Sequence, residues 1–289
     1  MTENTTHRPR RSALFLPASN ARAIEKARAL DADVVILDLE DAVAPDQKAT
    51  AREAAVAAVR SGGFGHRELV VRANAIGTAE AEADLAALAG SGAAAVLLPK
   101  VDDPQALHRA RALLGKGPAL WAMIETPRAI LDLPVIVAAA AATGLAALIA
   151  GTNDLAKELR CRPGPDRAPL VPVLVQIVVA ARAAGLVALD GVSNVLDDPA
   201  AVEAECRQGR ALGYDGKTLI HPSQVAPANA VFGPDEEEVR WARAVARAFD
   251  GAEAEDKGAI RVEGKMVERL HLEEARRTLA IHEAVTTRS

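Results

Sequence analysis

The strongest constraint on the fold of this chain is a regular alternation of short apolar runs with longer helical runs. Each apolar run is rich in β-branched residues or leucine, and the stretch that follows it repeats alanine, arginine and glutamate. This alternation is typical of βαβ units that build a parallel sheet. The expected strands span residues 13–16, 34–37, 69–72, 95–98, 120–124, 146–150, 186–189 and 217–220. The helices expected among them span residues 21–30, 47–60, 79–88, 104–114, 172–184 and 199–212.

The number and polarity of these units predict the fold class. The strands are almost entirely apolar, as expected when helices cover both faces of a parallel sheet. Eight βα units in a row close naturally into an α/β fold of the (β/α)8 or TIM-barrel type. We therefore predict a barrel over residues 1–225, followed by a C-terminal lid or oligomerisation segment over residues 226–289.

The C-terminal segment breaks the alternation. A helix with an acidic first turn is expected over 235–250, a polar stretch punctuated by glycine over 251–264, and a last helix over 272–285. A tail of this size is expected to be too small for a core of its own. It should pack on the barrel, on a neighbouring subunit, or over the active site as a helical lid.

Composition and charge exclude several classes of function. The formal net charge is −5 and aromatic residues make up 2% of the chain, which argues against a nucleic-acid partner. Two cysteines without a CxxC pair exclude a disulfide framework and favour a reducing compartment. The polar N-terminus is not a signal peptide, and the longest apolar stretch, 133–150, is interrupted by proline and glycine. A cytoplasmic protein without a membrane segment is expected.

Two adjacent strands are expected to end in carboxylates. In TIM barrels the catalytic groups project from the carboxyl ends of the strands. The fifth strand ends at Glu125 and the sixth is followed by Asn153 and Asp154, so Glu125 and Asp154 should lie side by side at the barrel mouth. Two carboxylates with open positions are the usual protein contribution to a Mg²⁺ site. The alternative is an acid–base pair without metal.

The second and third strands add opposite charges at the same end of the barrel. The second strand ends in Asp38, with Glu40 and Asp41 directly after it, and the third ends in Arg72. A guanidinium there would neutralise the acidic run and could bind a carboxylate or carbonyl oxygen. The alternatives are a helix-capping role for the acidic run and a purely structural ion pair for Arg72. Lys100, after the fourth strand, is as well explained as a solvated surface lysine as it is as a functional residue of the site.

Several segments together resemble the citrate lyase β-subunit/malyl-CoA lyase family, within the HpcH/HpaI aldolase group. The resemblance covers nearly the whole chain in the right order and is specific for the family rather than for the substrate. It rests on the segments Leu14-Phe15-Leu16-Pro17 with Arg22 and Lys26, Asp38-Leu39-Glu40-Asp41-Ala42-Val43, Val71-Arg72-Ala73-Asn74, Leu98-Pro99-Lys100, Ile124-Glu125-Thr126 and Gly216-Lys217 through His221-Pro222-Ser223-Gln224.

The resemblance implies roles for residues at matching positions. Glu125 and Asp154 would ligate Mg²⁺, and Arg72 would contact the oxo acid or the developing enolate oxygen. Glu40 and Asp41 would orient Arg72. The coenzyme A (CoA) and substrate site would be lined by Phe15, Arg22, Lys26, Arg72, Glu125, Asn153 and Lys217.

One position departs from the family pattern. Members of the family carry a catalytic aspartate in a C-terminal Gly-x-Met-Ile/Val-Asp segment, often delivered to a neighbouring subunit. Here the segment is Gly264-Lys265-Met266-Val267-Glu268, so Glu268 stands where aspartate is expected. Glu268 is the candidate general acid–base, and the alternative is a carboxylate that merely precedes the last helix.

The resemblance implies a Mg²⁺-dependent CoA-ester lyase that cleaves or forms a carbon–carbon bond between a small 2-oxo acid and an acyl-CoA. Malyl-, citramalyl- or citryl-CoA thioesters are the expected substrates, and a homotrimer or a multiple of it is the expected assembly. Three other functions stay open at this point. They are a CoA-independent metal aldolase for 2-oxo acids, a 3-hydroxyacyl-CoA thioesterase, and a non-catalytic protein that binds CoA esters.

Overall fold

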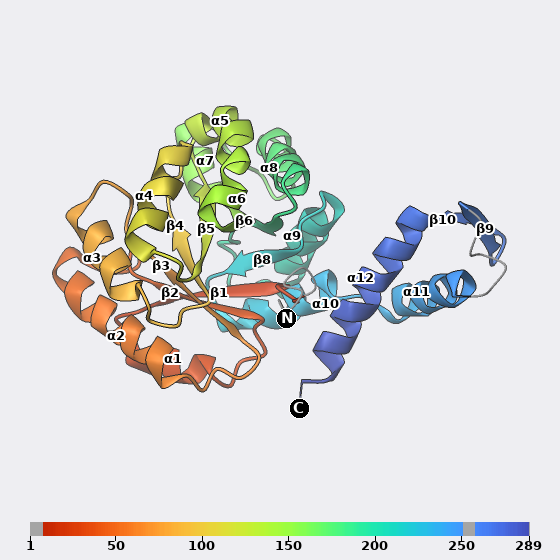
Figure 1. Cartoon of the computed structure of the whole chain (residues 1–289), viewed down its shortest axis with the longest axis horizontal. Coiled ribbons are helices and arrows are strands. Elements are labelled where there is room, and N and C mark those ends of the chain that lie inside the picture. The colour runs from red at the N-terminus through yellow and green to blue at the C-terminus, as the bar shows by residue number, and fades with distance from the viewer. Residues whose placement is uncertain (1–7, 251–257, 289) are drawn as a thin grey trace. The chain divides into compact units, whose positions relative to one another are not determined.

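The computed structural model describes residues 8–250 and 258–288, and eight of its strands close into a parallel barrel. Each strand pairs with the next along the chain, and β1 pairs with β8 to close the ring (Figure 1). The expected TIM barrel is confirmed. The barrel strands are β1 (Ser12–Pro17), β2 (Val34–Asp38), β3 (Glu68–Arg72), β4 (Ala95–Leu98), β5 (Ala119–Ile124), β6 (Leu145–Ala150), β7 (Val187–Asp190) and β8 (Gly216–Leu219).

Helices follow the strands and surround the barrel (Figure 1). Three of them begin with an oxygen-bearing cap followed by proline, at Asp103, Thr126 and Asp198, which satisfies free amides of the first turn. The helices of the barrel region are α1 (Ala21–Ala27), α2 (Lys48–Ser61), α3 (Ala79–Leu88), α4 (Pro104–Leu114), α5 (Pro127–Ala138), α6 (Ala140–Thr143), α7 (Thr152–Glu158), α8 (Val171–Ala183), α9 (Pro199–Ala211) and α10 (Val225–Phe232). Short 3₁₀ turns span Pro45–Gln47 and Pro222–Gln224.

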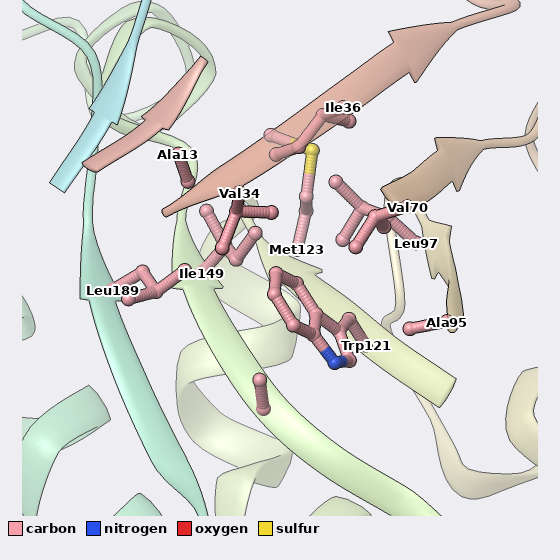
Figure 2. Packing of buried hydrophobic residues seen from close by; sticks show 11 residues of the cluster. Ala13, Val34, Ile36, Val70, Ala95, Leu97, Trp121, Met123, Ile149 and Leu189 are labelled. Carbon is pink, nitrogen blue, oxygen red and sulfur yellow. The ribbon is translucent and has the colours of Figure 1, made fainter. Parts of the chain in front are cut away.

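The interior of the barrel is filled by every second side chain of its strands. Successive residues of a strand point to opposite faces, so inward positions recur with a period of two. Figure 2 shows Trp121 and Met123 of β5 pointing into the barrel toward Val34 and Ile36 of β2 and Val70 of β3. These side chains are at most 7% exposed, so the interior of the barrel is a packed core and not a pore.

The chain divides into two compact units, Arg10–Asn229 and Ala230–Ser289 together with the first nine residues. The barrel unit thus ends a few residues after the boundary that we placed at 225. The second unit contains α11 (Glu236–Phe249), a two-stranded hairpin of β9 (Ala259–Val262) and β10 (Lys265–Glu268), and α12 (Arg269–Thr286).

The second unit has a small apolar cluster of its own, contrary to expectation. Val262 and Val267 of the hairpin are buried together with Val245 of α11 and Leu272 of α12. Where the sequence predicts a polar connection before Gly264, the structure has a hairpin, and this hairpin supplies side chains that complete the cluster. Within the described residues, no helix is long and apolar enough to cross a membrane.

Candidate active site

The inward-facing rows of β2, β3 and β5 continue past the apolar core to Asp38, Arg72 and Glu125. The alternation that packs the barrel therefore also aims charged side chains at its mouth. A cavity of about 310 Å³ opens there. It brings together six of the expected site residues, namely Phe15, Asp41, Arg72, Glu125, Asn153 and Asp154.

Glu125 is the most perturbed carboxyl group of this cavity. Its side chain is 2% exposed, and one oxygen, Oε1, accepts a hydrogen bond of 2.6 Å from the backbone amide of Lys100. The pKa of Glu125 is raised to about 7, chiefly by burial; the Lys100 amide acts to lower it, and the nearby carboxylates of Glu40 and Asp154 act to raise it. The carboxyl lies so close over Gly151 that a Cβ there would be 2.6 Å from Oε2. The glycine is thus required by the packing of Glu125.

Glu125 and Asp154 fit a Mg²⁺ ion. Asp154 lies in the first turn of α7 and lines the same cavity as Glu125. Two carboxylates that face one cavity repel each other, and a divalent cation removes that repulsion. In the described parts of the chain, no three His, Cys, Asp or Glu side chains group together as a metal site. The two carboxylates offer oxygen ligands, which suit Mg²⁺, an ion that keeps several waters.

Arg72 is held by a residue that our sequence reading left out of the site, Asp38. Its Nε and Nη2 donate to the two oxygens of Asp38 at 2.7 and 2.6 Å, and the backbone amides of Glu40 and Ala42 donate to the same carboxylate. Phe15 lies under the guanidinium, with Cζ 4.9 Å from the ring centre. Arg72 is therefore fixed in direction, and its remaining terminal nitrogen is Nη1.

Glu40 and Asp41 lie at this remaining nitrogen, as expected. Nη1 of Arg72 is 2.9 Å from Glu40 and 3.5 Å from Asp41. Burial raises the pKa of Glu40, against the lowering effects of Arg72 and Lys100. The Lys100 ammonium is 3.0 Å from Glu40 while its backbone amide holds Glu125, so Lys100 connects the two acidic groups.

Lys217 is not at the cavity, and this corrects our sequence reading. In β8 the inward-facing neighbour of Ala13 is Thr218, so Lys217 points outward. Its ammonium is 3.1 Å from Asp190 and 2.8 Å from Glu205, and the side chain is fully buried. A slip of one residue along a strand moves a side chain to the other face of the sheet. We therefore leave Lys217 out of the CoA site.

The other expected CoA contacts remain available to a ligand. Arg22 and Lys26 are exposed and lie one turn apart on α1, directly after β1, whose Phe15 lines the cavity. Side chains four residues apart share one face of a helix, so the two cations form a small basic surface.

Glu268 lies in the second unit, at the junction of β10 and α12. It is exposed, and its backbone amide donates to Nδ1 of His271 at 2.9 Å. The residue thus occupies the position before the first turn of a helix. A hairpin, rather than an irregular loop, presents it.

Comparisons with known proteins agree on one family. Residues 11–222 match the HpcH/HpaI aldolase/citrate lyase family. The chain is 46% identical over 277 residues to a (3S)-malyl-CoA thioesterase of Cereibacter sphaeroides, covering 96% of each chain. It is 33% identical to citrate lyase subunit beta of Escherichia coli, covering 94% of this chain and 93% of the other. The structure of protein CitE from Mycobacterium tuberculosis in complex with magnesium, acetoacetate and coenzyme A aligns with a TM-score of 0.75 at 33% identity, covering 94% of this chain and 97% of that one.

Proposed function

The chain belongs to the HpcH/HpaI aldolase/citrate lyase family, and from that premise we propose that it is a Mg²⁺-dependent enzyme acting on a malyl-CoA-type thioester. One observation supports the proposal most strongly. Glu125, Asp154 and Arg72 line the same cavity of about 310 Å³, and Arg72 is held in place there by Asp38. That volume suits a small acyl group. The rest of the CoA molecule would lie outside it.

Glu125 and Asp154 would hold Mg²⁺, and the family member with bound magnesium supports this assignment. When bound, the ion supplies Lewis-acid polarisation of a substrate carbonyl or carboxylate oxygen. Arg72, which Asp38 holds in direction, would place its positive charge near the oxygen on which negative charge develops. Arg22, Lys26 and Phe15 would contact the CoA moiety.

Of the reactions open to such a site, we propose thioester hydrolysis first. Water adds to the thioester carbonyl, the carbon–sulfur bond breaks, and the products are a hydroxy diacid and free CoA. The support is the 46% identity to a (3S)-malyl-CoA thioesterase over nearly the whole chain.

Carbon–carbon cleavage is the second candidate. In that reaction the 3-hydroxyl group loses its proton, the bond between C2 and C3 breaks, and a 2-oxo acid leaves an acyl-CoA enolate that is then protonated. The similarity to citrate lyase subunit beta supports it, as does the cation Arg72 at the cavity. Both reactions develop negative charge on an oxygen that this site is built to stabilise.

One assay separates the two reactions. The protein is incubated with malyl-CoA and Mg²⁺, free thiol is followed with a disulfide reagent, and 2-oxo acid is followed as its hydrazone. Hydrolysis releases thiol without 2-oxo acid, and carbon–carbon cleavage releases 2-oxo acid without thiol. Absence of both products, with CoA binding intact by calorimetry, would contradict the proposal and favour a non-catalytic binding protein. Activity that survives exhaustive chelation would contradict the Mg²⁺ assignment.

We also propose Glu268 as the general acid–base. Its support is the matching position in the family segment and its exposed place at the end of β10. Glu268→Gln keeps the shape and removes the proton acceptor, so kcat should fall by at least about a hundredfold. Glu268→Asp should retain activity, and Glu274→Gln on the same helix, also exposed, is the matched control. An unchanged kcat in Glu268→Gln would show that the residue only precedes and caps the last helix.

A further inference from the structure

Lys100, the second residue after β4, has a backbone conformation that few residues other than glycine adopt. Its φ is 50°, in the left-handed region. The next residue, Val101, is fully buried, and its amide donates to the carbonyl of Met123 in β5 at 3.3 Å. The chain therefore makes its left-handed turn at Lys100 and rejoins the barrel at once. A strained conformation of this kind persists only where surrounding contacts hold it.

Two polar contacts hold Lys100 in this conformation, one from its backbone and one from its side chain. The backbone amide donates to Oε1 of Glu125 at 2.6 Å. The ammonium donates to Oε1 of Glu40 at 3.0 Å, and the other oxygen of Glu40 is 2.9 Å from Nη1 of Arg72. Arg72 is in turn fixed by Asp38. Lys100 thus ties the carboxyl at the end of β5 to the group anchored on β2 and β3.

The amide contact limits the orientations of the Glu125 carboxyl. Glu125 is buried and packs closely over Gly151, so its side chain has little room to move. A hydrogen bond from a backbone amide to a carboxylate is one of the stronger kinds, and it fixes one of the two oxygens in place. Because Oε1 accepts this bond, Oε2 is the oxygen that remains for a ligand of the cavity.

We propose that Lys100 is a positioning residue, whose left-handed backbone aims its amide at Glu125 and whose ammonium, bound to Glu40, keeps the backbone in that conformation. The sequence leaves Lys100 either as a solvated lysine or as a functional one, and these contacts favour the functional role. The inference rests on the proposed function, because Glu125 is there one of the two carboxylates that hold Mg²⁺. Lys100 would act on the ion only through Glu125.

The charge of Lys100 and its positioning effect influence a bound cation in opposite directions. Loss of the ammonium, 3.0 Å from Glu40, leaves the carboxylates around it less neutralised, and this alone would strengthen Mg²⁺ binding. Loss of the support that the amide gives to Glu125 would weaken it. Two variants that both lack the charge isolate the backbone, namely Lys100→Gly and Lys100→Val. Glycine adopts a positive φ without steric cost, whereas a β-branched residue is rarely found there.

Calorimetric titration with Mg²⁺ measures the affinity of each metal-free protein, and thermal unfolding reports its stability. Lys100→Val should bind Mg²⁺ about tenfold or more weakly than Lys100→Gly, as expected when a residue that orients a metal ligand is lost. Lys100→Met, which removes the charge and keeps the length, should also bind more weakly than the wild type. Arg160 is the matched control, because it is exposed, has a φ of 53° and does not line the cavity. Arg160→Gly and Arg160→Val should bind Mg²⁺ equally well.

The outcomes distinguish this inference from the proposed function. If the wild type binds Mg²⁺ and the folded glycine and valine variants of Lys100 bind it equally well, the positioning role is overturned and the proposed function stands. Tighter binding in Lys100→Met than in the wild type would show that the ammonium acts by its charge alone and would overturn its holding role. Absence of Mg²⁺ binding in the wild type would overturn both proposals. Lys100→Ala, which also disfavours a positive φ, replaces the valine variant if that protein does not fold.

Discussion

Two charged clusters of the same barrel are built differently. The inner cluster lies on the inward face at the mouth and comprises Asp38, Glu40, Asp41, Arg72, Lys100, Glu125 and Asp154. The outer cluster lies between the barrel and its helices and comprises Arg167, Asp190, Glu205 and Lys217. The inner cluster has five carboxylates and two cations, whereas the outer cluster has two carboxylates and two cations.

The difference in charge balance appears in the pKa of the buried carboxyl at each centre. Burial acts to raise the pKa of both. In Asp190 the cations Lys217 and Arg167 reverse that effect, so its pKa is lowered. For Glu125 the neighbouring carboxylates add to the effect of burial, and its pKa is raised to about 7. We infer that the balanced cluster stabilises the fold, while the unbalanced one is arranged to receive a cation.

The largest effect is expected from breaking the outer cluster. Lys217→Met removes a buried cation from beside Asp190 and Glu205, and loss of one partner of a buried ion pair costs about 3–5 kcal/mol. Denaturant unfolding measures the loss. The exposed Lys116→Met variant should lie within about 0.5 kcal/mol of the wild type. A folded Lys217→Met protein with wild-type stability would show that the outer cluster does not stabilise the barrel.

A change in the inner cluster should affect turnover more than stability. Asp154→Asn removes one of the two charges proposed to hold Mg²⁺, and turnover should fall by more than about a hundredfold. Loss of a residue that only hydrogen-bonds to a metal ligand costs about 10- to 100-fold, and loss of a ligand itself should cost more. The matched control is Glu158→Gln at the exposed end of the same helix. Equal turnover in Asp154→Asn and the control would remove Asp154 from the site.

The arginines of the two clusters offer a direct comparison. Arg72→Lys keeps the charge but cannot reproduce the two parallel donors to Asp38, so the remaining cation is misplaced and kcat/KM should fall by up to about a hundredfold. Arg167→Lys should instead lower the free energy of unfolding. If Arg72→Lys keeps near-normal turnover, Arg72 acts only as a point charge.

The raised pKa of Glu125 predicts a smaller, graded dependence on pH. Below about pH 7 a proton must leave Glu125 before Mg²⁺ binds, so affinity should weaken by up to about tenfold per pH unit. The metal-free protein should lose stability as pH rises from 4.5 to 7, since the folded state retains a proton that the unfolded chain has released. Glu125→Gln should abolish this contribution. Unfolding followed at several pH values in both proteins tests it.

Much of the barrel was predictable because its strands are nearly all apolar. The expected ends of β5 and β6 placed Glu125 and Asp154 correctly at one cavity. The face of the sheet to which each side chain points is harder to predict from the sequence. Counting by two from Val34 would have found that Asp38 faces inward.

Lys217 and the hairpin are two features that the sequence pattern does not predict. In β8 the short run Gly216–Leu219 carries too few apolar residues to mark its inward row, so the pattern does not tell which face Lys217 is on. The hairpin turns at Glu263 and Gly264, both with positive φ, on strands of only four residues. A two-residue turn ending in glycine is the sequence signal for such a hairpin.

Whether the inner cluster binds a cation can be measured directly. Calorimetric titration of Mg²⁺ into the metal-free protein measures this in the wild type, in Glu125→Gln and in the exposed control Glu158→Gln. We expect one Mg²⁺ per chain in the wild type and the control, and a loss of affinity of more than about a hundredfold in Glu125→Gln. Unchanged binding in Glu125→Gln, or no binding to the wild type at all, would contradict the account.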